Sequence, residues 1–125
     1  MLKSDSTKPI YVQIAEWLEN EIIKDHIKTD EKVYSQYQLA EIFNINPATA
    51  AKGLNMLADD GVLYKKRGLG MFVTKEGKAI ILEKRKNQTL KGLIKDLVQE
   101  CRSLNVSKDE IVQLIQSEFD KGGDQ

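Results

Sequence analysis

Residues 35–73 read SQYQLAEIFNINPATAAKGLNMLADDGVLYKKRGLGMFV, and this stretch decides the fold. Its first part is expected to form a helix that begins after Ser35, because serine is a good N-cap and Gln38 completes a capping box. Asn44 follows the last apolar residue of this helix, Phe43. Asparagine tolerates the left-handed backbone of a tight turn, so the sequence predicts a turn between two helices at this point.

The second helix is expected to begin at Asn46-Pro47, since asparagine caps free amides and proline suits the first helical position. Ala50, Leu54 and Leu57 recur at helical spacing and predict its buried face. A glycine follows the last turn, as is common at helix ends.

A β-hairpin should complete the stretch. Residues 62–64 and 71–73 are short apolar runs, and two glycines in Gly68-Leu69-Gly70 supply the backbone freedom that a hairpin tip needs. Helix, turn, helix and hairpin in this order form a winged helix-turn-helix, which most often places its second helix in the DNA major groove. We therefore expect a mainly α fold with a small β-hairpin, and a DNA-binding function.

A further helix is expected before this stretch, from Pro9 to about Lys24, because apolar residues recur in it at four-residue spacing. It should pack on the other two helices. Together these elements form the expected DNA-binding domain, residues 1–74.

The C-terminal part, residues 75–125, is expected to be a two-helix dimerisation region. The sequence predicts one long helix over 76–104 and a second over 108–120, which opens with a capping box at 107–110. The long helix has a polar middle, where the basic run 84–86 is most simply expected to be solvated. The alternative is that this run adds phosphate contacts. Both helices carry apolar side chains at helical spacing, namely Leu90, Leu93, Ile94, Leu97, Val98, Cys101, Leu104, Ile111, Leu114, Ile115 and Phe119.

Length and composition are those of a small soluble protein, with 125 residues, 41% hydrophobic and 30% charged. The apolar runs are only a few residues long, too short to span a membrane. The N-terminus lacks the apolar core of a signal peptide, and the lone Cys101 fits a reducing compartment. These features predict a cytoplasmic protein.

Catalytic motifs are absent from the sequence. The single histidine, His26, has no cysteine or paired carboxylate at motif spacing, and there is no P-loop, G-x-S-x-G, HExxH or CxxC. Metal ligands are too few for a site. We therefore expect no enzyme, no cofactor and no bound metal.

The chain has no net charge, but its basic residues are concentrated in one part of the sequence. Nineteen Lys and Arg balance nineteen Asp and Glu, and residues 1–74 carry nine basic and ten acidic side chains, a net charge of minus one. A nucleic-acid-binding domain is usually basic. Between Asp60 and Glu76, however, every charged residue is basic. Screening limits the reach of a charge to about 8–10 Å at physiological salt, so this local cluster matters more than the total.

Residues 9–73 resemble the GntR family of bacterial transcription regulators. No single part of the match is specific, but the parts occur together in the family's order and spacing. They are PIYVQI at 9–14, the segment 35–40, the opening of the second helix at 46–49, and the hairpin from DGVLY at 60–64 to GLGMFV at 68–73.

The opening Asn46-Pro47-x-Thr49 and the short C-terminal part are most similar to the YtrA subfamily. This resemblance implies a homodimer held together by the C-terminal helices, and the subfamily often controls neighbouring transporter operons. Many GntR proteins have arginines where this chain has Tyr37, Pro47 and Ala51, and those arginines commonly meet phosphates or bases. Their absence leaves the operator sequence open.

Helix 46–60 is the expected recognition helix. Asn46, Ala48, Thr49 and Lys52 should face the DNA, where threonine suits a phosphate or a thymine methyl and lysine a phosphate or guanine. Asn46 serves equally well as a helix cap alone. The alternative for Lys52 is a solvated surface lysine.

The start of the preceding helix should bind phosphate. Its free amides attract anions, and Ser35, Gln36 and Tyr37 carry hydrogen-bonding groups. The alternative for Tyr37 is packing at the domain edge.

The hairpin tip should enter the minor groove. Arg67 suits the negative potential of a narrow groove, Gly68 permits close approach, and Lys65 and Lys66 should hold the flanking phosphates. An ordinary basic turn is the alternative.

The C-terminal stripe could pack on its own winged helix or on a second copy. A helix of about 29 residues extends about 43 Å, too long to lie wholly on so small a domain. We therefore expect a homodimer that binds double-stranded DNA at a palindromic operator, most simply as a repressor. The alternative is a winged-helix protein-interaction module without direct DNA binding. An unidentified small-molecule effector could act on either, but no polar cluster marks its site.

Overall fold

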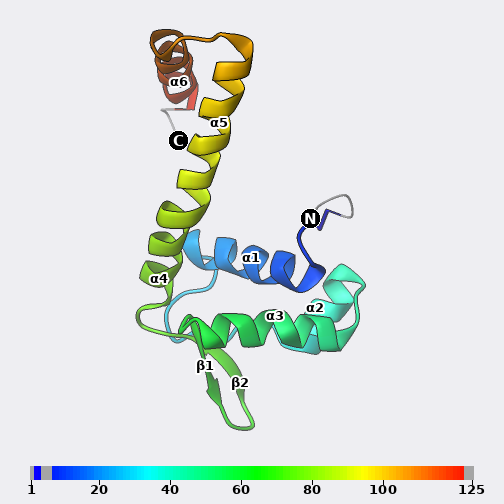
Figure 1. Ribbon diagram of the computed structural model, residues 1–125. Coiled ribbons are helices and arrows are strands. Elements are labelled where there is room, and N and C mark those ends of the chain that lie inside the picture. The colour runs from blue at the N-terminus through cyan, green and yellow to red at the C-terminus, as the bar shows by residue number, and fades with distance from the viewer. Residues whose placement is uncertain (1, 4–6, 123–125) are drawn as a thin grey trace. The chain divides into compact units, whose positions relative to one another are not determined.

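The computed structural model describes residues 2–3 and 7–122. The chain separates into two compact units, a winged-helix unit (Met1–Lys84) and a helical unit (Arg85–Gln125). Figure 1 labels the elements, which in chain order are α1 (Ile10–Ile23), α2 (Gln36–Phe43), α3 (Pro47–Asp59), β1 (Leu63–Lys66), β2 (Gly70–Val73), α4 (Gly77–Lys84), the π-helix η1 (Arg85–Leu90), α5 (Lys91–Leu104) and α6 (Lys108–Gly122).

The first unit is the winged helix-turn-helix expected from the sequence. The Ser35 hydroxyl accepts a hydrogen bond from the Gln38 amide at 3.1 Å, and the Gln38 side chain accepts one from the Ser35 amide at 2.8 Å, which forms the capping box of α2. Asn44 adopts a left-handed backbone, with φ of 53°. Asn46 caps α3 by accepting a hydrogen bond from the Ala48 amide at 2.8 Å. Local chemistry therefore fixes the turn between α2 and α3.

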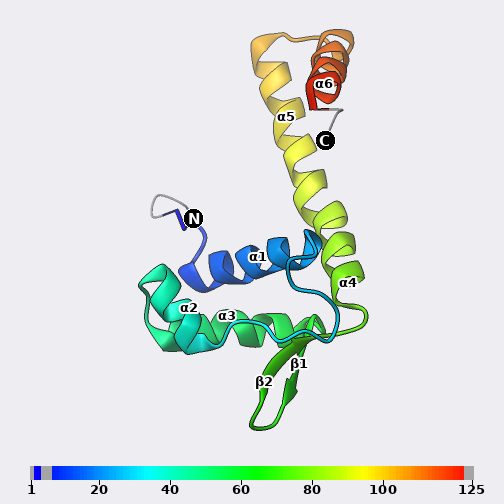
Figure 2. The ribbon, with the colours of Figure 1, turned by 180° about the vertical axis from the view of Figure 1, so that it is seen from behind.

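Helix α1 packs across α3 and closes the core (Figures 1 and 2). The approach is close at Gly53, where an added Cβ would lie 2.8 Å from the Tyr11 carbonyl oxygen. The Trp17 ring of α1 lies tilted against Tyr34 and edge-to-face with Phe43 at the edge of this core. The buried cluster is Ile14, Ala15, Leu18, Ile22, Ile27, Val33, Leu39, Ala50, Leu54, Leu57, Val62, Leu63, Val73 and Ile81.

The hairpin is longer than the sequence indicated and has a third participant. Its strands pair antiparallel from Leu63 with Val73 to Lys66 with Gly70. Lys32 also forms a bridge with Phe72. The connection after α1 thus hydrogen-bonds to the outer edge of β2 and ties the hairpin to the helices.

The winged-helix unit extends past residue 74 and includes α4. Ile81 of α4 is fully buried in the shared core. At the end of α4, Lys84 donates a hydrogen bond to the buried Glu19 of α1 and lies 3.7 Å from Asp60. The expectation that Lys84 is solvated was therefore wrong, because the fold brings it to a buried carboxylate from a distant part of the sequence.

The helical unit also differs from expectation. The continuous α-helix predicted over 76–104 is interrupted by η1, which coincides with the polar run RKNQTL. No residue of η1 is buried, so packing does not favour one helical hydrogen-bond pattern over the other there. Asn105 ends α5 with φ of 58°, and the Ser107 hydroxyl accepts a hydrogen bond from the Glu110 amide at 3.1 Å. Over the described residues, none of the helices has the length and apolar character that crossing a bilayer requires.

Candidate nucleic-acid interface

The start of α2 offers polar groups at the surface. The Ser35 hydroxyl oxygen accepts its capping bond but can still donate its proton to an anion. Gln36 is half-buried and Tyr37 is 69% exposed. Because Tyr37 projects into solvent, it is not packed at the domain edge.

Helix α3 presents a narrower face than expected. Ala48 and Lys52 are exposed, whereas Thr49 is half-buried. The Lys52 ammonium lies 4.1 Å from the centre of the Tyr11 ring, which holds it beside α1. The side-chain oxygen of Asn46 is engaged in the cap. Asn46 therefore caps the helix, as its alternative role required. Lys52 is at the surface, as its alternative required, but it also contacts the Tyr11 ring.

The hairpin places its basic residues on different faces. Side chains alternate along a strand, so Lys65 and Lys66 point to opposite sides. The Lys66 ammonium lies 4.5 Å from the centre of the Phe72 ring, while Lys65 lines a depression beside α2 and α3. Arg67 and Gly68 are exposed at the tip, and Gly68 has φ of 78°.

A hydrogen bond from Tyr64 to Asp30 braces the hairpin. The Tyr64 hydroxyl donates to the Asp30 carboxylate at 2.8 Å. This hydrogen bond, then burial and the negative charge of Asp30, raise the pKa of Tyr64. The brace joins β1 to the segment that also pairs with β2, so the wing is held from both strands.

Groups from α2, α3 and the hairpin meet around one depression of about 310 Å³. The sequence predicted these three elements as separate contacts, and the fold brings them to a common surface. Figures 1 and 2 both show α2 beside α3. The lining residues are Tyr34, Ser35, Gln36, Tyr37, Ala51, Leu54, Asn55, Lys65, Gly70 and Met71.

A second depression, of about 660 Å³, adjoins the first along α3. It is lined by the predicted residues Gln36, Ala48 and Lys52, and also by Tyr11, Ala51, Asn55, Met56, Asp59 and Asp60. Five predicted residues line neither depression, namely Asn46, Thr49, Lys66, Arg67 and Gly68. The structure thus brings part of the predicted DNA-binding residues together around the two depressions, whereas the residues of the wing tip lie outside them.

Asn55 is the residue that the sequence analysis missed. It is exposed and lines both depressions. At 100° per residue it lies 20° from Ala48 around the helix axis, so helical spacing could have identified it. The contacts predicted from the sequence all lie in the first two turns of the helix.

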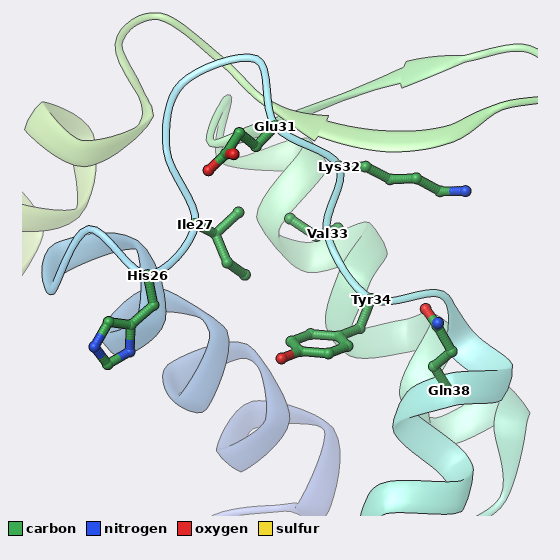
Figure 3. A pocket seen from close by; sticks show the side chains of 7 residues that line it. All are labelled: His26, Ile27, Glu31, Lys32, Val33, Tyr34 and Gln38. Carbon is green, nitrogen blue, oxygen red and sulfur yellow. The ribbon is translucent and has the colours of Figure 1, made fainter.

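A further hollow, of about 520 Å³, lies beside the segment after α1 (Figure 3). Its polar side chains already have partners nearby in the sequence. The His26 Nδ1 atom lies 2.9 Å from the Glu21 Oε2 atom, and the Glu31 carboxylate accepts a hydrogen bond from the Lys28 amide. In Figure 3, Lys32 extends away from His26. These groups do not converge on one point, so the hollow lacks the geometry of a small-molecule site.

The helical unit has an apolar groove of about 540 Å³ between α5 and α6. Six predicted dimerisation residues line it, namely Ile94, Leu97, Val98, Cys101, Ile111 and Ile115. The other four, Leu90, Leu93, Leu104 and Leu114, are exposed outside it. All ten therefore remain accessible to a partner in the single chain.

A family model described as "Bacterial regulatory proteins, gntR family" matches residues 10–73, which is the winged helix up to the end of β2. The chain belongs to the GntR family. It is a transcription regulator whose winged helix is of the DNA-binding kind, as the resemblance implied.

The relatives of this GntR protein extend the match into its C-terminal part. It is 28% identical over 110 residues to the HTH-type transcriptional repressor YtrA of Bacillus subtilis, covering 88% of this chain and 84% of YtrA. A GntR family transcriptional regulator from Listeria monocytogenes superposes with a TM-score of 0.72 at 26% identity, covering 90% and 97% of the two chains. The expected similarity to YtrA is thereby confirmed.

A second similar structure contains DNA. The DNA-binding domain of AraR in complex with operator ORE1 has a TM-score of 0.53 and 30% identity, covering 59% of this chain and 90% of that one. The similarity covers little more than half of this chain.

Proposed function

We propose that this chain is a homodimeric repressor that binds a palindromic operator in double-stranded DNA. The observation that carries the proposal is the common surface of α2, α3 and β1 around the first depression, to which Ser35, Gln36, Tyr37 and Lys65 contribute. The similarity to an operator-bound domain and to a protein named as a repressor supports it. Its site of action would be the cytoplasm, and its activity would be binding rather than catalysis.

The contacts follow from the position of each group. Ala48, Thr49 and Lys52 on α3 would enter or border the major groove. Ser35, Gln36 and Tyr37 would contact phosphates at the start of α2. Asn46 would add a phosphate contact from its side-chain amide nitrogen, which the helix cap does not use. Lys65 and Lys66 would hold phosphates on either side of the wing, and Arg67 with Gly68 would reach the minor groove.

A second copy would complete the protein. The apolar side chains of α5 and α6 are exposed in the single chain, and a two-fold partner would cover them and present two recognition helices to one face of DNA. An effector, if one controls this dimer, would shift the balance between DNA-bound and free forms.

Fluorescence anisotropy tests the proposal. The full chain is titrated onto the DNA upstream of its own gene and onto an unrelated duplex of equal length, each at two salt concentrations. Tighter, saturable binding to the upstream DNA, with affinity falling steeply as salt rises, is the expected result. Equal and salt-insensitive binding to both duplexes would favour a protein-interaction module instead.

A further inference from the structure

Three residues line both depressions on the recognition surface, and they lie where the two meet. They are Gln36 of α2 and Ala51 and Asn55 of α3. We infer that Asn55 reads an adenine in the major groove and is a specificity-determining residue of this protein, with Gln36 as the neighbouring amide. This inference rests on the proposed function.

The amide of Asn55 is available for this contact. Asn55 is exposed, and within the described part of the chain its side chain makes no hydrogen bond to protein. Asn46 differs, because its side-chain oxygen accepts the capping bond from Ala48. An asparagine amide can accept from the N6 amino group of adenine and donate to N7 at the same time, a pairing that no other base offers in the major groove.

The surroundings of Asn55 leave room for a base edge. Ala51 and Ala48 precede it by four and seven residues on the same face of α3, so only methyl groups stand between Asn55 and the helix start. An alanine methyl suits contact with a thymine methyl, and a base pair of adenine with thymine presents both groups in the major groove.

The charges around Asn55 favour a base over a phosphate. Lys65 lines the first depression and Lys52 the second, so each depression has a basic residue in its lining. Asp59 lies one helical turn beyond Asn55 and lines the second depression too. Its carboxylate would repel a phosphate placed against this part of the helix. Lysines would therefore hold the backbone at the flanks while the uncharged amides meet the bases.

The test begins with the full-length protein and its operator, selected from a random duplex library. The affinity is then measured for every single-base substitution of that operator, for the wild type and for Asn55→Ala. We expect one adenine in each half-site to be preferred by the wild type by roughly ten- to hundredfold. In Asn55→Ala this preference should disappear at that position and persist at the others.

Replacing that adenine with 7-deazaadenine removes the N7 acceptor without changing the pairing of the base. The replacement should weaken the wild type but leave Asn55→Ala unaffected, because the lost contact is the same one. Gln113→Ala, which removes an exposed amide from the polar side of α6, is the matched control and should leave the preference intact.

Three outcomes separate the inference from the function beneath it. A wild type that selects no sequence would overturn the proposed function. A wild type that selects an operator, with an unchanged preference map in Asn55→Ala, would overturn the role of Asn55 alone. A uniform loss of affinity at all positions in Asn55→Ala would make Asn55 a backbone contact and would equally overturn adenine reading.

Discussion

The winged-helix unit and the helical unit place their apolar side chains in opposite ways. In the first, Ile14, Leu18, Leu39 and Leu57 are fully buried in a core drawn from four helices and the hairpin. In the second, none of the residues of α5 or α6 is buried. Leu93, Leu104 and Phe119 there are 61%, 63% and 75% exposed.

This difference indicates which unit can be stable alone. Chains of about 40 residues seldom bury enough surface to fold without a partner or a covalent link. In the proposed homodimer, the apolar faces of α5 and α6 would form half of a core that a second copy completes. The winged-helix unit already has its own core, so it should stay folded whether or not the protein is a dimer.

The largest effect is expected from Leu97→Asp. Leu97 lines the apolar groove, and a carboxylate there would have to be desolvated in the dimer. Sedimentation equilibrium should show monomers. Operator affinity should fall about 100-fold or more, because linked binding modules commonly gain 10²–10⁴ in avidity.

The control for this variant is Gln99→Asp, which places the same carboxylate on the polar side of α5. It should remain dimeric and bind the operator as the wild type does. If Leu97→Asp also remains dimeric, the interface lies elsewhere, and the apolar groove needs another explanation.

A second prediction concerns the ion pair that ends the winged-helix unit. Lys84→Met would leave the carboxylate of Glu19, which is 1% exposed, without this cation. The free energy of unfolding should fall by about 3 kcal/mol, at the lower end of the usual cost because Lys84 is itself 27% exposed. Chemical denaturation measures the change.

Lys86→Met is the matched control, since Lys86 is exposed in η1 and should change stability by about 0.5 kcal/mol or less. Equal stability of the two variants would mean that the ion pair between Lys84 and Glu19 adds no net stability, and that the packing of Ile81 alone joins α4 to the core.

Sequence reasoning identified the features that depend on neighbouring residues. Ser35, Asn44 and Asn46 act on backbone groups within a few positions, so their types and spacing were sufficient. Glu19 and Lys84 are 65 residues apart, and no local pattern pairs them. The bridge between Lys32 and Phe72 is non-local in the same way.

The interface shows the same limit. Helix capping and basic residues pointed to α2, α3 and the wing, but only the fold shows that Gln36, Asn55 and Lys65 share one surface. The contact between the Lys52 ammonium and the Tyr11 ring likewise depends on how α1 crosses α3. Which side chains touch DNA remains a prediction.

A third, smaller effect is expected from Arg67→Ala. Arg67 is exposed at the wing tip, so its removal should not unfold the winged-helix unit. Affinity for the operator should fall roughly tenfold, and the slope of log affinity against log salt should decrease by about two, one for each copy of Arg67 in the dimer. Anisotropy titrations at several salt concentrations measure both.

The same change in a Leu97→Asp background sharpens the comparison of the two units. If the winged helix contacts DNA independently of the dimer interface, Arg67→Ala should lower the DNA affinity of each winged helix by the same factor in both backgrounds. A factor that vanishes in the monomer would show that the wing reaches DNA only when two copies are joined.

The smallest predicted effect is a dependence of stability on alkaline pH. The hydrogen bond to Asp30 raises the pKa of Tyr64 in the folded state, so the protonated hydroxyl contributes stability that is fully present below the unfolded pKa. That contribution is lost as the pH rises through the higher folded value. Tyr64→Phe should remove this part of the alkaline decline, while Tyr37→Phe, which changes an exposed ring, should keep it.

Ultraviolet absorbance can follow this ionisation, and it reports on one unit only. All four tyrosines, Tyr11, Tyr34, Tyr37 and Tyr64, lie in the winged-helix unit. The late-ionising tyrosine should therefore be the same in the wild type and in the Leu97→Asp monomer, because the brace between β1 and the segment after α1 needs no second copy. A titration that changed with dimerisation would mean that the helical unit influences the wing, and the two units could not be treated as independent.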